Sequence, residues 1–138
     1  MLQPFQNKAS VKARRDRGTG FVDAVAMGLI LVLVALALFD FLVVAFANSV
    51  NDAAAKNAAR AAANQSDPSI AADAATKAVP AVSGFITELT LLSLDYKKND
   101  VVTAKTKMEV KLPVPFPCFG DKLVFMASDT EAILTSSH

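Results

Sequence analysis

The sequence is poor in the side chains on which catalytic and metal sites most often depend. It contains one cysteine, Cys118, and one histidine, His138, in 138 residues. A single cysteine excludes an intramolecular disulfide, and a single histidine excludes Cys/His zinc clusters and histidine-based triads within one chain. We therefore expect no enzymatic activity, no cofactor and no metal site.

Charge is also absent from a long segment near the amino terminus. No charged residue occurs from Ala24 to Phe39, and Asp40 is the only one between Ala24 and Ala47. As a helix, residues 24–47 would extend about 36 Å, which is enough to cross a bilayer core of about 30 Å. The segment contains no proline, so nothing forces a kink. The sequence therefore predicts a transmembrane helix over residues 19–47.

The charged residues are unevenly divided around this segment. Residues 1–18 carry five lysines and arginines against one aspartate, whereas residues 19–138 carry nine basic and twelve acidic residues. Basic residues just before a membrane helix hold that end in the cytoplasm. We expect an inner-membrane protein whose C-terminal part is exported. An acidic exported part is a poor candidate for binding nucleic acid.

An ordinary secretory signal peptide is one alternative explanation of the apolar segment. Ala45, Phe46 and Ala47 fit the small-x-small rule for cleavage by signal peptidase. The apolar region of such a peptide usually has about 7 to 15 residues. Here it is longer, and Asp40 interrupts its end, which favours a retained helix.

The order of motifs around the apolar segment resembles one known family. A basic cluster at residues 14–17 precedes Gly18, and Asp23 is the fifth residue after that glycine. Asp40-Phe41 follows the apolar run, and an alanine-rich stretch occupies residues 51–63. This order resembles the TadE/TadF branch of the type IV pilin-like proteins, which take part in tight-adherence pilus assembly. The resemblance covers residues 14 to about 65, and it departs from the family in having Asp23 for the usual Glu and a second glycine, Gly20.

The resemblance implies a structural role as a pseudopilin or minor pilin at the membrane, with a possible place in a pilus. A prepilin peptidase would cleave the leader between Gly18 and Thr19. The residues implied in assembly with other pilin or pseudopilin subunits are Asp23, Asp40 and Phe41, and Asp23 would meet the amino terminus of an adjacent subunit. The alternative is a single-pass membrane protein whose exported domain binds a ligand or partner and never enters a filament.

Outside the apolar segment, the first 65 residues contain a leader and an extension of the helix. Residues 1–18 form the basic leader. Within it, the hydrophobic residues of positions 1–13 follow neither the helix nor the strand spacing, so this part is expected to be disordered. Residues 48–65 are expected to continue the helix on the exported side, because alanine is the best helix former. Val50, Ala54, Ala58 and Ala61 form a narrow stripe along it. This stripe would pack either on neighbouring helices or on the protein's own domain.

Residues 66–138 have the pattern of a small mixed domain. Ser66 or Asp67 is the expected N-cap of a second helix that begins near Pro68 and ends near Val79. Strict alternation from residue 102 to residue 112 predicts a strand with one buried face, flanked by strands over residues 87–97 and 122–134. We expect a hairpin turn at residues 98–100 and a loop at residues 113–121. The predicted fold class is thus α+β: a long N-terminal transmembrane helix, then a head with a second helix and a three-stranded antiparallel sheet.

Overall fold

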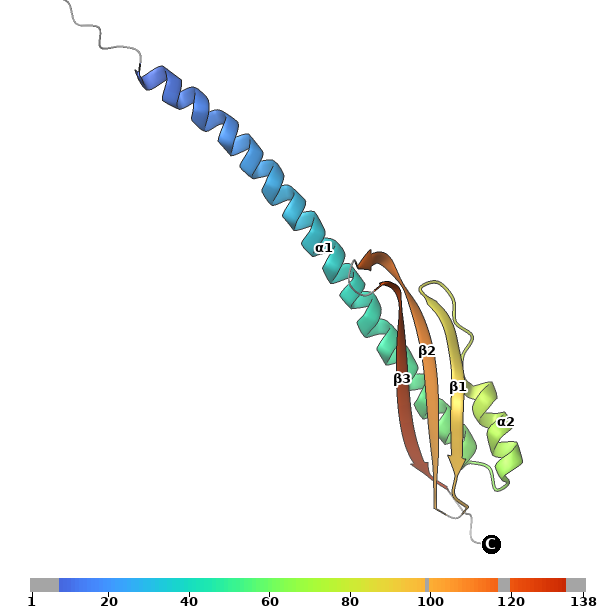
Figure 1. Cartoon of the computed structure of the whole chain (residues 1–138). Helices are drawn as coiled ribbons and strands as arrows, with labels where there is room; N and C mark the ends of the chain where they lie inside the picture. The colour runs from blue at the N-terminus through green and yellow to red at the C-terminus, as the bar shows by residue number, and fades with distance from the viewer. Residues whose placement is uncertain (1–7, 99, 117–119, 134–138) are drawn as a thin grey trace, which may run out of the picture. The chain divides into compact units, whose positions relative to one another are not determined.

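The computed structural model describes residues 8–98, 100–116 and 120–133, and the side chains of residues 20–98, 100–114 and 120–133. Its elements are α1 (Lys8–Ala63), α2 (Pro68–Ala78), β1 (Ile86–Tyr96), β2 (Val101–Phe116) and β3 (Gly120–Ala132) (Figure 1). This is the predicted α+β layout, which is confirmed. Cys118 and His138 lie outside the described residues.

The chain divides into two compact units, Met1–Leu38 and Phe39–His138, and the boundary falls inside α1. The second unit, which we call the head, therefore includes residues 39–47, which the sequence predicts as the end of the transmembrane helix. Val43 and Ala47 belong to the head because they pack in one cluster with Ile86, Met108 and Val110 of the sheet.

α1 begins at Lys8, so the expectation of disorder over residues 1–13 is wrong for residues 8–13. The segment from Lys8 to Ala13 contains lysine and alanine, which are good helix formers, and has no proline or glycine. A helix that is already formed downstream adds such residues at little cost, because propagation is easier than nucleation.

The C-terminal part of α1 packs on the sheet through small side chains. The buried residues recur every three or four positions, the spacing of one helix face: Ala47, Asn51, Ala54, Ala55, Ala58, Ala59, Ala62 and Ala63. Of the predicted stripe, Ala54 and Ala58 are buried, whereas Val50 and Ala61 are half-buried. The stripe thus packs on the protein's own domain.

α2 begins where the sequence predicts. Asp67 is the N-cap, and its Oδ1 accepts hydrogen bonds from the backbone N–H of Ser69 at 2.8 Å and from the Ser69 hydroxyl at 2.6 Å. These bonds hold the pKa of Asp67 below its ordinary value. Pro68 occupies the first turn, where its missing N–H costs nothing. α2 packs beside β1 and contributes Ala71 and Ala75 to the core (Figure 1).

The sheet has the order β1-β2-β3, and both pairs of strands are antiparallel (Figure 1). β1 ends at Tyr96 and β2 begins at Val101, on either side of the predicted turn, and the Asp100 N–H donates to the Lys97 carbonyl at 3.0 Å. Residue 99 of that turn lies outside the described residues. β2 is the central strand, and its inward side chains alternate as predicted. All six are buried: Val102, Ala104, Thr106, Met108, Val110 and Leu112.

The loop expected at residues 113–121 is wrong for residues 113–116 and 120–121, which belong to strands, and residues 117–119 lie outside the described residues. β2 continues to Phe116 and β3 starts at Gly120, although the register is irregular between Lys111 and Phe116. Proline has a backbone φ near −65°, which an extended chain accommodates. The segment that contains Pro113 thus remains extended where the regular ladder of hydrogen bonds is interrupted, as is usual for proline in strands.

Candidate functional site

The most extensive surface feature of the described chain is the apolar stretch of α1 that ends at Leu38. Its large side chains are exposed all around the helix, from Phe21 and Val22 to Leu36 and Leu38. Within the described residues, one helix is long and apolar enough to cross a membrane, and it contains this stretch. A helix that packs on a protein core buries the apolar side chains of one face. Exposed apolar side chains all around a helix are typical of a segment that is covered by something outside the chain.

The processing and assembly residues of the first unit lie along α1. Gly18 and Thr19 lie within the helix. Asp23 is exposed. Among the residues whose side chains are described, 20–98, 100–114 and 120–133, the Asp23 carboxylate has no ion-pair partner.

Asp40 and Phe41 are adjacent in sequence but have opposite environments. Asp40 is only 4% exposed, and its Oδ1 accepts a hydrogen bond from the Val114 N–H at 3.4 Å. The other carboxylate oxygen, Oδ2, is buried without a hydrogen-bond partner among the described residues. Phe41 is 67% exposed. The acid therefore faces the head, and only the phenylalanine is free to contact a partner.

Asn51 is a buried polar residue that the sequence analysis did not identify. The Thr106 hydroxyl of β2 donates to Asn51 Oδ1 at 2.8 Å, and both residues are fully buried. The Asn51 side-chain amide nitrogen, Nδ2, has no partner within the described chain. Asn51 falls on the helical spacing of the buried alanines and Thr106 on the inward positions of β2, but the alanines of α1 form more than one stripe, so the local sequence does not show which stripe meets the sheet.

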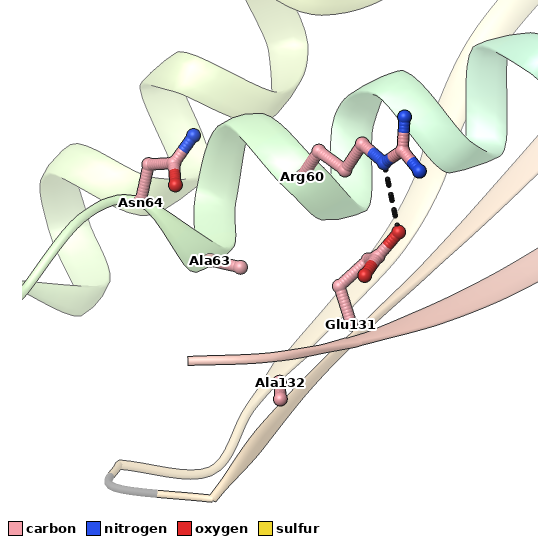
Figure 2. A pocket seen from close by; sticks show the side chains of 5 residues that line it. All are labelled: Arg60, Ala63, Asn64, Glu131 and Ala132. Carbon is pink, nitrogen blue, oxygen red and sulfur yellow. Dashed lines mark hydrogen bonds and ion pairs between the residues drawn. The ribbon is translucent and has the colours of Figure 1, made fainter. Parts of the chain in front are cut away.

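At the other end of α1, Arg60 forms an ion pair with Glu131 of β3, with 2.9 Å between Nε and Oε1. Figure 2 shows this pair. The two side chains help to line a pocket of about 320 Å³. Its lining residues are Arg60, Ala63, Asn64, Glu131 and Ala132. The two charges are in direct contact and neutralise each other, so this pocket has no unpaired charge from Arg60 or Glu131 to bind a charged ligand.

The outer face of the sheet carries a second ion pair. Lys122 Nζ of β3 lies 2.6 Å from Glu109 Oε1 of β2. The hydrogen bond from Lys122 holds the pKa of Glu109 below its ordinary value, and the same bond raises the pKa of Lys122. Both side chains are reached by water, so the pair adds little to stability.

Chemical groups that could hold a metal are scattered in the described residues. No set of three or more His, Cys, Asp or Glu side chains comes together in that part of the chain. Comparison of the chain with protein-family models, curated proteins and solved structures gave no match. The candidate site consists of the exposed apolar stretch of α1 with Asp23, and of the exposed Phe41 on the same helix.

Proposed function

We propose that this protein is a membrane-anchored structural subunit of pseudopilin or minor-pilin type, which takes part in the assembly of a tight-adherence type pilus or secretion system. The observation that supports this most is the division of one continuous helix. Up to Leu38 its large apolar side chains are exposed, and from Phe39 on a stripe of small residues packs on an antiparallel sheet.

The length of the exposed stretch fits a bilayer. Residues 20–38 extend about 28 Å as a helix, close to the hydrocarbon thickness of about 30 Å. The basic residues before Gly18 favour a cytoplasmic amino terminus and an exported head. The first unit would thus be the anchor, and the head would lie on the outer side of the inner membrane.

The packing of the head disfavours ordinary secretion with cleavage after Ala47. Such cleavage would remove Asp40, Val43 and Ala47, which lie against the sheet. Their loss would expose apolar surface of the cluster that contains Ile86, Met108 and Val110, at a cost of about 25 cal/mol for each Å². Cleavage at Gly18 removes none of the head.

The intact mass of the mature protein tests this proposal directly. After expression with a prepilin peptidase, we expect a chain that begins at Thr19. Gly18→Leu should leave the precursor uncut, because this class of peptidase needs a small residue before the scissile bond. Gly20→Leu is the matched control and should still be cut, since Gly20 lies beyond the bond. A chain that still begins at Met1 would favour the simple membrane-anchored binding protein, and one that begins at Asn48 would indicate a signal peptide.

A further inference from the structure

One end of the head combines aromatic and basic side chains that the proposed function does not use. We call it the Phe85 end and define it by Phe39, Phe85, Lys111, Val114 and Lys122. The rings of Phe39 and Phe85 meet edge to face, with centroids 6.3 Å apart. The Lys111 N–H donates to the Phe85 carbonyl at 2.8 Å, and Lys111 lies opposite Lys122 in the sheet. Val114 is tied to Asp40, the residue after Phe39.

The two rings of this end are held apart from the core. Phe85 is 48% exposed and Phe39 is exposed to a similar extent, although both are large apolar side chains. Gly84, with φ of +78°, turns the chain just before Phe85, a conformation that other residues rarely adopt. The local backbone therefore presents an aromatic side chain at the rim of the sheet.

The two lysines of the Phe85 end differ in their acidic partners. Lys122 is paired with Glu109, and the charges of Asp121 and Glu88 also favour its ammonium form. Lys111 lies opposite Lys122, a like charge, and no ion pair involves Lys111 among the described residues. A surface that supplied negative charge beside Lys111 would give its ammonium group a partner.

We propose that the Phe85 end rests in the interfacial layer of a bilayer that contains anionic phospholipid. The inference rests on the membrane anchor of the proposed function, because Leu38, the last residue of the apolar stretch, is joined directly to Phe39. Phenylalanine rings gain by burial among acyl chains. Lysines beside them can keep their ammonium groups at the phosphate level by extending along the interface. Each lysine near an anionic surface favours the bound state by about fivefold.

Spin labels in the full-length chain test this contact. In a Cys118→Ser background, Phe85→Cys carries the label, and the protein is reconstituted into vesicles of phosphatidylcholine with phosphatidylglycerol. A label in lipid collides with oxygen but not with a water-soluble nickel chelate. We expect that result at position 85. Ile70→Cys, on an exposed apolar residue of α2, is the control and should be open to the chelate.

The accessibility of the label at position 85 distinguishes contact with lipid from exposure to water and from contact with a protein partner. The proposal is overturned if a label at position 85 is as accessible to the nickel chelate as a label at position 70. It is also overturned if the label at position 85 is shielded from both oxygen and the chelate, because that result indicates a protein partner. Ser83→Cys provides a second exposed position at this end if Phe85→Cys does not fold. Leu33→Cys places a label in the proposed membrane anchor. A lipid signal at position 33 without one at position 85 contradicts the lipid contact of the Phe85 end but not the anchor. The absence of a lipid signal at position 33 contradicts the anchor as well.

The role of charge is tested by Lys111→Gln. Replacing phosphatidylglycerol by phosphatidylcholine should raise chelate access at position 85, and Lys111→Gln should raise it in the mixed vesicles to a similar degree. Lys105→Gln is the matched control, since Lys105 is an exposed lysine of the same strand about 20 Å further along it. Equal effects of the two substitutions, or no effect of phosphatidylglycerol, would contradict recognition of anionic lipid.

Discussion

The Thr106 hydroxyl of β2 donates a hydrogen bond of 2.8 Å to Oδ1 of Asn51, a residue of α1 that precedes it by 55 positions. It is the one polar contact between fully buried side chains of the helix and the sheet within the described chain. The other buried side chains of α1 from Ala47 to Ala63 are all alanines, which are alike at every turn of the helix. The pair therefore fixes which face of α1 meets β2.

We predict that Thr106→Val destabilises the head by about 1–3 kcal/mol, because it leaves Asn51 Oδ1 buried without a donor. The double variant Asn51→Leu, Thr106→Val should lose less than the sum of the single variants, since it removes both polar groups. Thermal unfolding in detergent micelles measures this effect through the near-ultraviolet circular dichroism of Tyr96. Tyr96 is a clean reporter because the chain has one tyrosine and no tryptophan. Strictly additive losses would show that the two side chains do not act as a pair.

For Asp40 we predict the opposite effect: a substitution that stabilises the head. Its carboxylate is buried with one long hydrogen bond and an unpartnered Oδ2. Burying a carboxylate costs several kcal/mol, whereas a hydrogen bond to a charged group returns about 1.5–3 kcal/mol at best. Asp40→Asn keeps an acceptor for the Val114 N–H and removes the charge, so we expect it to stabilise the head by about 1 kcal/mol or more. The Tyr96 signal measures this, with Asp52→Asn, on the exposed side of α1, as control. A fall in stability would mean that the acid has a further partner.

The ion pair of Glu109 and Lys122 predicts a pH dependence. The folded-state pKa of Glu109 is lowered, so its contribution to stability is present above the ordinary glutamate pKa and is lost as pH falls through the folded value. The folded-state pKa of Lys122 is raised, so its contribution is lost only as pH rises through that raised value. Glu109→Gln should therefore lower the unfolding temperature slightly at neutral pH and have no effect in strong acid. The difference should also shrink at high salt, as screening requires. A difference that persists in acid would point to packing and not to charge.

Particular residues show what the sequence could and could not predict. The strand β2 was predictable because its inward positions, from Val102 to Leu112, alternate strictly with polar residues. The start of α2 was predictable because Asp67 and Pro68 have local capping roles. Both signals act over a few residues.

The environments of Asp40 and Asn51 could not be predicted in the same way. Apolar neighbours look alike whether a bilayer or a sheet covers them, so Asp40 could be assigned to the edge of the membrane as easily as to the head. Asn51 is buried because of the rotation of α1 on the sheet, which depends on contacts with residues far along the chain. The helix itself gives no local signal for that rotation, since its alanines form more than one possible stripe.

The last prediction concerns Asp23, which is exposed on α1 and has no ion-pair partner in the described part of the chain. Cleavage after Gly18 would create an α-amino group with a pKa of about 8, so that it is mostly charged at neutral pH. An unpaired carboxylate at the start of a membrane segment is costly, and pairing with the amino group of an adjacent subunit would reduce that cost. We therefore expect Asp23→Ala to leave membrane insertion intact but to abolish co-purification with other pilus subunits.

Asp23→Glu is the matched control for this loss. It keeps the charge and adds one methylene, and the family that the chain resembles carries glutamate at this position, so co-purification should be retained. Membrane fractionation of both variants shows whether insertion is unchanged, and the Tyr96 signal shows whether the head is folded. If Asp23→Ala co-purifies as well as the unmodified chain, Asp23 is only an interfacial charge. The protein would then be better described as a single-pass anchor for an exported binding domain.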